Sequence, residues 1–419
     1  MKNILHYSNK NIGLLGLGTV GKAVYDEIFT NISSVLVKNL TKSRNIELSN
    51  VKITNNFQDI LQDKNVETII ELIGGETPAY EYIKESIKSK KNVITANKEV
   101  MAKYGKELLE LATKNKVFLL YEASVAGGIP IISPIIKDLS ANEFKSVRGI
   151  INGTTNYILT KMSRENLELI EVLKEAQDLG YAESDPTSDI EGFDAQYKIS
   201  ILSRLAFNSD VSLDQIYLEG ISSIKSKDFD YANELGYTIK LLATASINSN
   251  ELLLVKVHPA LIPNDVPMAS VNGVLNAVEI DGDLVGTLWF QGAGAGAKAT
   301  ASSVLSDLIR IRNSDVQSIV NHKKTYKITS MDKHFCQYYL RLNVSDKPGV
   351  LASIAKEFGE RNISISSVLQ KDLYENGSAD LVIMTYPSIE KDMQASIKKI
   401  TNLESVFNIE SMIRVESYK

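Results

Sequence analysis

Residues 11–21 constrain the fold of this chain more than any other stretch, because they join a short apolar run to a glycine-rich turn. The run NIGLL is typical of a buried strand, and KAVYDEIF after the turn is typical of a helix. In this context G-x-G-x-x-G favours a dinucleotide site over a generic glycine turn, because the glycines let the backbone approach a pyrophosphate at the helix N-terminus. The residues expected to bind the cofactor here are Gly16, Gly18, Thr19, Val20 and Gly21.

Apolar runs alternate with helical stretches beyond this turn. Such β-α alternation predicts a doubly wound parallel sheet, in which ligands bind at the carboxyl ends of the strands. Gly74 and Lys98 each follow the end of an expected strand, so both are expected to face the cofactor. Strands are expected at 34–37, 68–73, 92–96 and 117–121, and helices at 78–88 and 99–114.

The end of the second strand bears on the choice of cofactor. An acidic residue at this place would bind the ribose 2′-hydroxyl of NAD. The chain instead has Lys38 and Asn39, followed by Lys42 and Arg44. These cations could accept a 2′-phosphate, which favours NADP over NAD. The alternative is that Lys38 is a solvated loop residue and that both cofactors are accepted.

Composition excludes several classes of protein. A chain of 419 residues is too long for one hydrophobic core and predicts two or three domains. The net charge of -5 implies no preference for nucleic acid or a membrane surface. The single cysteine, Cys336, rules out an internal disulfide framework and a cysteine metal cluster. No signal peptide is visible, and glycines and prolines interrupt the apolar residues 117–136, so we expect a cytoplasmic protein.

An acid-rich block, LGYAESDPTSDIEGFDAQYK, spans residues 179–198 and ends in a lysine. A helix is predicted from Phe193 onward, which puts Asp194 and Lys198 on one face. Acids beside one lysine suit a substrate that carries an ammonium group and needs a proton. The alternative is a solvated acidic loop before a helix, whereas the spacing of the acids excludes a calcium loop.

Two further loops could bind ligands. Glu122 precedes small residues and two glycines in YEASVAGGIPII, whose carbonyls could turn toward a monovalent cation; a plain tight loop is equally compatible. Residues 152–156, NGTTN, predict an N-capped helix start that could equally face a ligand carboxylate.

These stretches together resemble homoserine dehydrogenase, and the likeness covers nearly the whole chain. The residues that carry it are GLGTVG, Asn97-Lys98, the Glu122 loop, INGTTNYIL, GYAESDPTSDIEGFDAQYK and QGAGAGAKATASSVLSDL, in that order. The resemblance implies reversible NAD(P)H-dependent reduction of L-aspartate 4-semialdehyde to L-homoserine, on the route to threonine and methionine. The alternatives are another NADP-dependent reductase of an amino-acid-like substrate and a catalytically silent NADP-binding sensor.

The resemblance also implies roles for individual residues. Lys198 matches the catalytic lysine and Lys98 the second lysine at the reacting centre; which of them donates the proton stays open. The residues expected to bind the substrate are Glu183, Asp194, Asp189 and Thr154. Further cofactor contacts are expected from Gly180, Glu183, Gly296, Lys38, Gly74 and Lys98. The main-chain oxygens expected to bind sodium or another monovalent cation are those of Glu122, Val125, Gly127 and Ile129.

The C-terminal part predicts a ferredoxin-like βαββαβ unit. Its phrase DKPGVLASIAKEFGERNISISSV resembles the ACT regulatory domain, in which the loop at Pro348-Gly349 would receive an amino acid. Family members with this tail are often inhibited by threonine. Many of them carry Thr-His after the third ACT strand, whereas this chain has Thr385-Tyr386, so the effector stays open. A dimerisation module without a ligand is the alternative.

The expected architecture is therefore α/β with three parts. A discontinuous Rossmann-like nucleotide domain takes residues 1–130 and 297–312, and an α+β domain for substrate binding and dimerisation takes residues 131–296. A linker at 313–336 leads to the ACT domain at 337–419. A homodimer or homotetramer is expected.

Overall fold

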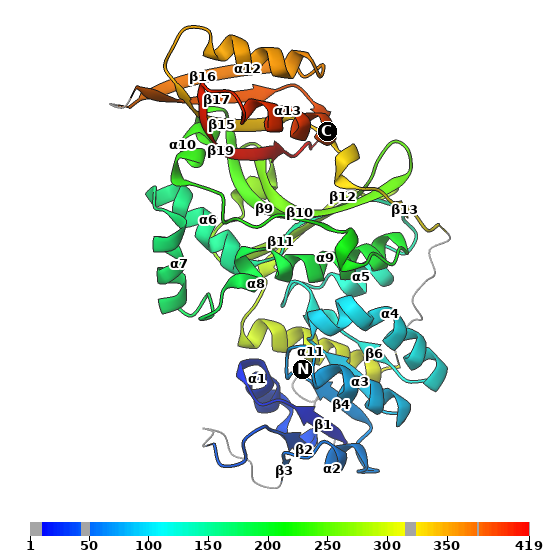
Figure 1. The fold of residues 1–419 in the computed structure, drawn as a ribbon. Helices are drawn as coiled ribbons and strands as arrows, with labels where there is room; N and C mark the ends of the chain where they lie inside the picture. Colours follow the sequence, from blue (N-terminus) through cyan, green and yellow to red (C-terminus); the bar gives the residue numbers. More distant parts are fainter. Residues whose placement is uncertain (1–10, 43–50, 315–323, 375–376, 419) are drawn as a thin grey trace. The chain divides into compact units, whose positions relative to one another are not determined.

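The computed structural model describes residues 11–42, 51–314, 324–374 and 377–418, the coloured ribbon of Figure 1. Arg44 and part of the expected linker lie outside these residues. The chain divides into two compact units, which are described separately below. The first unit comprises Met1–Val147, Tyr197–Leu213 and Asn276–Tyr326, and the second comprises Arg148–Gln196, Asp214–Leu275 and Lys327–Lys419.

A parallel sheet organises the first unit. Among the described residues it has six strands in the order β3-β2-β1-β4-β5-β6, and each neighbouring pair is parallel. This confirms the doubly wound sheet and adds β3, which the sequence analysis did not expect. The order reverses between β1 and β4, the place where such sheets bind their ligands. The strands are β1 (Ile12–Leu15), β2 (Ile32–Leu36), β3 (Lys52–Thr54), β4 (Thr68–Glu71), β5 (Asn92–Thr95) and β6 (Leu119–Leu120).

Helices cover both faces of this sheet because its strands are apolar on both sides. All four residues of β1 are buried; Leu14 packs toward one face and Leu15 toward the other. The face of Leu14 is covered by α1 and α11, and the face of Leu15 by α2 and α3. The helices of this unit are α1 (Thr19–Ile28), α2 (Gln58–Leu61), α3 (Ala79–Lys88), α4 (Lys98–Asn115), α5 (Ile132–Ile136) and α11 (Ala297–Arg312).

The helix α11 returns to the nucleotide-binding sheet from late in the sequence. Its residues Ala301, Val304 and Leu308 are buried in the same core cluster as Val24 of α1. The hairpin before it consists of β11 (Leu275–Gly282) and β12 (Gly286–Ala293).

The turn of this hairpin lies at residues 283–285. Residues 142–143 hold its tip: Val285 N donates to Asn142 Oδ1 at 2.9 Å, and Glu143 N donates to Asp283 Oδ1 at 2.8 Å. These contacts let the strand pairing continue through Gly282.

A long antiparallel hairpin lies at the centre of the second unit. It pairs β9 (Tyr237–Ile247) with β10 (Leu252–Pro263), from Leu253 opposite Ile247 to Pro263 opposite Tyr237. The boundary between the two units falls within β7 and within α9. The other elements before the C-terminal module are β7 (Phe144–Ile150), α6 (Gly153–Glu165), α7 (Leu169–Asp178), α8 (Thr187–Ile190), α9 (Phe193–Phe207), β8 (Tyr217–Leu218) and α10 (Ser226–Glu234).

The C-terminal module has the expected βαββαβ order. Its strands lie in the order β19-β15-β17-β16, all neighbours antiparallel, and α12 and α13 share one core with the sheet. The elements are β15 (Tyr338–Ser345), α12 (Val350–Gly359), β16 (Ile365–Leu373), β17 (Ser378–Thr385), α13 (Glu390–Ile400) and β19 (Val406–Val415), with a small added sheet of β14 (Phe335–Cys336) and β18 (Ser388–Ile389).

The side of β10 opposite β9, called here its free side, pairs with three short parallel segments instead of one long strand. β13 (Lys327–Ile328) pairs with Leu252 and Leu253, and β8 pairs with Lys256 and Val257. β19 of the C-terminal module pairs with Ala260 and Leu261. The described end of the expected linker is therefore part of the sheet.

Buried arginines fix the C-terminal module to the rest of the second unit. Arg341 of β15 donates to Asp228 of α10 at 2.7 Å, and both side chains are almost inaccessible to solvent. Asp228 also accepts from the Tyr339 hydroxyl at 3.1 Å. Arg414 of β19 donates to Glu219 at 2.7 Å and to the Tyr217 hydroxyl of β8 at 2.9 Å.

None of the described helices is both long enough and apolar enough to cross a membrane.

We expect Asp228→Ala to loosen the C-terminal module, because it leaves the buried guanidinium of Arg341 without its closest carboxylate. Breaking a buried ion pair costs about 3–5 kcal/mol. Hydrogen-exchange mass spectrometry should therefore show faster exchange in peptides from β15 and β17. Asp230→Ala, at an exposed carboxylate of the same helix, is the control and should change little. Equal protection in both variants would mean that the buried pair does not hold the module in place.

Candidate active site

Each of the three positions in the first turn is a glycine for a different physical reason. Gly16 has φ +97°, and a Cβ there would lie 2.6 Å from the Leu72 carbonyl oxygen. A Cβ at Gly21 would lie 2.2 Å from the Gly16 oxygen. A Cβ at Gly18 would meet no described protein atom within 4 Å, although Gly18 caps α1. The fold itself therefore requires Gly16 and Gly21, whereas the space beside Gly18 suits the pyrophosphate of a dinucleotide. Thr19 and Val20 form the first turn of α1, where backbone N–H groups lack helical partners.

A second glycine turn lies beside the first one, at the carboxyl end of β4. The segments that follow β1 and β4 lie side by side, since Leu72 N donates to Leu15 O at 2.8 Å. Gly74 and Gly75 both have positive φ, and a Cβ at either would meet no described atom within 4 Å. Gly74 thus lies at the switch point of the sheet, as expected.

The end of β2 carries no acid among its described residues. Val37 is buried, and Lys38, Asn39 and Lys42 are exposed at the surface. Asn39 is used locally, because its side-chain oxygen accepts from both the backbone and the hydroxyl of Thr41 at 2.8 Å. Lys38 therefore lies exposed just after the carboxyl end of β2.

The two candidate lysines lie in two helices of the first unit that pack together, α4 and the part of α9 from Tyr197 onward. Lys98 is the first residue of α4, which Asn97 caps by accepting from Val100 N at 3.1 Å. Beside Lys198 in α9, the Tyr197 hydroxyl donates to Glu99 at 3.5 Å. Further along, Arg204 donates to the carbonyl oxygens of residues 101 and 102 at 2.9 and 3.0 Å. The contact of Tyr197 with Glu99 brings the chain neighbours of both lysines together.

Only part of the acid-rich block forms a cluster. In the second unit, the side-chain amide of Asn152 donates to Asp189 at 2.6 Å and to Asp194 at 2.9 Å. Two other acids have local roles: Asp185 accepts from the backbone and hydroxyl of Thr187, and Glu191 accepts from Ser222. The cluster predicted from sequence therefore narrows to the acids around Asn152.

Asn152 is a residue that the sequence analysis treated only as a helix cap. It does cap α6, accepting from Thr155 N at 2.8 Å, but its amide nitrogen also orients the two carboxylates. The same asparagine thus serves both the helix and the acids. The signal available in the sequence was only the cap itself.

The remaining candidates of the second unit lie at the turn after α7. Gly180 has φ +76° and open space beside it, and Glu183 is exposed. Thr154 donates its hydroxyl to the Tyr181 carbonyl at 2.7 Å, which ties the start of α6 to this turn. The structure therefore places Thr154 next to the segment of Gly180 and Glu183.

The loop that begins at Glu122 is built around its side chain. The buried carboxylate accepts from the backbone N–H groups of Ile131, Ile132 and Ser133 at 2.7, 2.8 and 2.7 Å. Burial raises the pKa of Glu122, and these N–H groups oppose that shift. The carboxylate thus closes the loop onto the start of α5.

The helix α11 holds this loop from the other side. Glu122 N donates to Asp307 at 2.9 Å, and the Ser303 hydroxyl donates to the Gly127 carbonyl at 2.7 Å. Burial, with the nearby charge of Glu122, raises the pKa of Asp307 to about 7. A Cβ at Gly127 would lie 2.4 Å from the Gly294 oxygen, so the loop also touches the turn before Gly296. Val125 and Ile129 are buried in the same loop.

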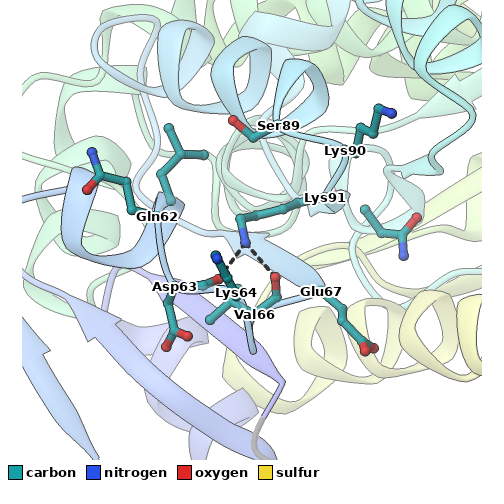
Figure 2. Close-up of a pocket in the computed structure, with 10 residues that line it drawn as sticks. Gln62, Asp63, Lys64, Val66, Glu67, Ser89, Lys90 and Lys91 are labelled. Atoms are coloured by element: carbon teal, nitrogen blue, oxygen red, sulfur yellow. Dashed lines mark hydrogen bonds between the residues drawn. The ribbon is translucent and has the colours of Figure 1, made fainter.

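A hollow of about 500 Å³ lies elsewhere in the first unit, lined by residues such as Gln62, Glu67 and Lys90 (Figure 2). Lys91 at its floor donates to the carbonyls of Asp63 and Val66 at 2.8 and 2.5 Å. These residues precede β4 and β5, so the hollow lies at the amino ends of the strands, opposite the glycine turns. Lys91 therefore holds a loop, and the hollow is not the cofactor site.

Three family models match the chain. The model for the NAD binding domain of homoserine dehydrogenase matches residues 16–122, and the model for homoserine dehydrogenase matches residues 130–309. The ACT domain model matches residues 338–405.

Relatives match over the full length. A homoserine dehydrogenase of Neisseria gonorrhoeae is 42% identical over 430 residues, which cover 97% of this chain and 98% of the relative. The solved homoserine dehydrogenase of Thiobacillus denitrificans is 38% identical with a TM-score of 0.91, covering 98% of this chain and 100% of that one. A hyperthermophilic archaeal homoserine dehydrogenase, solved in complex with NADPH, is 26% identical with a TM-score of 0.63, covering 74% and 99%.

We expect Gly18→Ala to weaken dinucleotide binding without disturbing the fold. The added methyl group meets no protein atom, but it occupies the space beside the turn where the pyrophosphate approaches. The dissociation constant of NADPH, measured by fluorescence titration, should rise about tenfold, which corresponds to about 1.4 kcal/mol.

Gly16→Ala is the matched comparison for this prediction. It forces a Cβ against the Leu72 carbonyl at positive φ, so the free energy of unfolding should fall by about 1–3 kcal/mol. Gly18→Ala should leave that free energy within about 0.5 kcal/mol of the wild type. If Gly18→Ala leaves the dissociation constant of NADPH unchanged, the pyrophosphate does not bind at this turn.

Proposed function

The chain belongs to the homoserine dehydrogenase family, and on this premise we propose how its own residues carry out the reaction. It is an NAD(P)-dependent oxidoreductase with a C-terminal ACT regulatory domain. The reaction that we propose is the reversible reduction of L-aspartate 4-semialdehyde to L-homoserine. The observation that carries the assignment of residues is that Lys198 is buried in α9, which Arg204 joins to α4, the helix that begins with Lys98.

Lys198 is proposed as the catalytic lysine. A bound reduced nicotinamide would supply the hydride, and the oxygen of the former aldehyde would need a proton. Lys198 is 8% exposed, in a helix that packs against α4. A buried ammonium donates to a developing alkoxide more effectively than a solvated one, because water does not compete for it. Lys98, at the start of the neighbouring helix, is proposed to bind the carbonyl oxygen or the cofactor.

The acids around Asn152 are proposed to bind the substrate ammonium. Asp194 is 2% exposed and lies in the same helix as Lys198, four residues earlier. Asp189 shares the amide of Asn152 with it, which fixes both carboxylates in orientation. Charge-assisted hydrogen bonds to such fixed carboxylates give directional recognition of an ammonium group. Glu183 and Thr154 complete the proposed substrate contacts.

The proposed cofactor is NADP. The support is that residues 37–42, the described segment directly after β2, carry the cations Lys38 and Lys42 and no carboxylate. The archaeal relative was solved with NADPH, which agrees with this choice. Gly18 and Gly74 leave open space at the switch point, and we place the pyrophosphate there. Gly180 and Gly296 are proposed as further cofactor contacts, and both have positive φ.

A monovalent cation is proposed for the loop of Glu122. The proposed ligands, taken from the resemblance to the family, are the main-chain oxygens of residues 122, 125, 127 and 129. Ala126 and Gly127 both have positive φ, which turns successive carbonyls out of a regular path. Such oxygens suit sodium because they are hard, neutral donors. The cation would keep this loop in one conformation beside α11.

An amino-acid effector, with threonine as the first candidate, is proposed for the ACT domain. Gly349 caps α12 with φ +94°, so the loop before this helix takes a conformation that favours glycine. Tyr386, in place of the histidine of many relatives, is 55% exposed at the end of β17. A homodimer or homotetramer is proposed, since ACT ligands bind between domains.

Lys38→Ala tests the choice of cofactor. Loss of a charged contact to the 2′-phosphate should raise the KM for NADP about tenfold and leave the KM for NAD nearly unchanged. The measurement is steady-state oxidation of homoserine with each cofactor. Lys52→Ala, at an exposed cation at the start of β3, is the control. Equal effects on both cofactors would contradict a role in binding the phosphate.

Lys198→Ala tests the reaction itself. Without a general acid and base, kcat for homoserine oxidation should fall by about 10²–10⁴, while NADPH binding stays near the wild-type value. Lys174→Ala, at an exposed lysine of α7, should retain full activity. A loss of only a few-fold in Lys198→Ala, with the fold intact by circular dichroism, would exclude Lys198 as the proton donor.

A further inference from the structure

A buried carboxylate without an assigned role lies at the carboxyl end of β4. Glu71 is the last residue of this strand and is inaccessible to solvent. Its two oxygens accept from different groups: Oε1 from Ile73 N at 2.7 Å, and Oε2 from the Thr95 hydroxyl at 2.6 Å. Burial raises the pKa of Glu71. An acid is costly to bury, so its place beside the glycine turn calls for an explanation.

The hydrogen bonds of Glu71 continue to the start of α4. The Thr95 hydroxyl, which donates to Glu71, also accepts a hydrogen bond from Asn97 N at 2.9 Å. Asn97 caps α4 through Val100 N and donates its side-chain amide to the Gly75 carbonyl at 2.7 Å. The chain of contacts therefore begins and ends in the segment after β4, and it passes directly before Lys98.

The direction of each bond makes this chain specific. Because Glu71 accepts from Thr95, the threonine oxygen has its lone pairs available for Asn97 N. A glutamine at position 71 has one acceptor oxygen and one NH₂ donor, so it must turn the NH₂ toward either Ile73 N or the Thr95 hydroxyl. One of the two contacts is then lost or reversed.

We propose that Glu71 is a positioning residue, which fixes Lys98 and the Gly74-Gly75 turn in their reactive places through Thr95 and Asn97. The inference rests on the proposed role of Lys98 at the reacting centre. Glu71 itself touches no substrate in this scheme. It joins the ends of two neighbouring strands, so the turn that faces the cofactor and the lysine that faces the aldehyde move as one.

The experiment compares Glu71→Gln with a pair of variants at its partner, Thr95→Val and Thr95→Ser. In Glu71→Gln and Thr95→Val, kcat for homoserine oxidation should fall about tenfold to a hundredfold, since a displacement of about 1 Å is enough for such a loss. Thr95→Ser keeps the hydroxyl and should restore most of the activity. A serine variant as impaired as the valine variant would overturn the proposal.

Thr54→Val is the matched control for stability. Thr54 makes the same kind of bond, from its hydroxyl to Asp59 at 2.6 Å, at the end of the edge strand β3. Both valine variants should lower the unfolding temperature by similar amounts, but only Thr95→Val should lower kcat. Equal kcat values in Thr54→Val and Thr95→Val would mean that the bond between Thr95 and Glu71 stabilises the fold only and does not position Lys98.

A double-mutant cycle with Lys98→Met separates this inference from the proposed function. If Glu71 acts through Lys98, Glu71→Gln should lower kcat much less in the Lys98→Met background than in the wild type. If Lys98→Met alone leaves kcat unchanged, the role of Lys98 fails. If Lys98→Met impairs turnover and Glu71→Gln adds its full loss to it, the positioning role of Glu71 fails.

Discussion

Two buried carboxylates, those of Glu122 and Asp307, join segments of the first unit. The Glu122 carboxylate accepts from three backbone N–H groups of residues 131–133, and the Asp307 carboxylate accepts from Glu122 N, 185 positions earlier in the chain. The nucleotide sheet is thereby tied to α11, the helix that returns after the β11–β12 hairpin. Because buried polar groups are stable only with hydrogen-bond partners, these contacts hold the loop, α5 and α11 together.

The local features of the fold could be predicted from the sequence, and the buried polar contacts could not. Strand and helix periodicity, the glycine turn at Gly16 and the cap at Asn152 are all encoded within a few residues, and each is present in the structure. The tip of the β11–β12 hairpin is bound by Asn142, which lies far away in sequence and gives no local signal of this contact. Glu71 and Asp228 had no local signature, since their partners come from other strands and helices.

In the candidate site, too, local features could be predicted from the sequence and long-range contacts could not. Lys198 and Asp194 were expected on one helix because their spacing of four residues needs only local geometry. The narrowing of the acid-rich block to the carboxylates around Asn152 needed the structure, since Asp185 and Glu191 look equivalent in sequence but have neighbours of their own. The packing of α9 against α4, through Arg204 and Tyr197, likewise depends on contacts about a hundred residues apart.

The free side of β10 has a consequence for how such enzymes gain or lose a regulatory tail. Two of its three parallel partners, β13 and β19, come from residues after 326. A chain cut before them would bare unpaired N–H and C=O groups along β10, an edge that attracts other strands and promotes aggregation. A tailless enzyme with this hairpin therefore has to shield that edge by other means, with charges, a proline or a shorter strand.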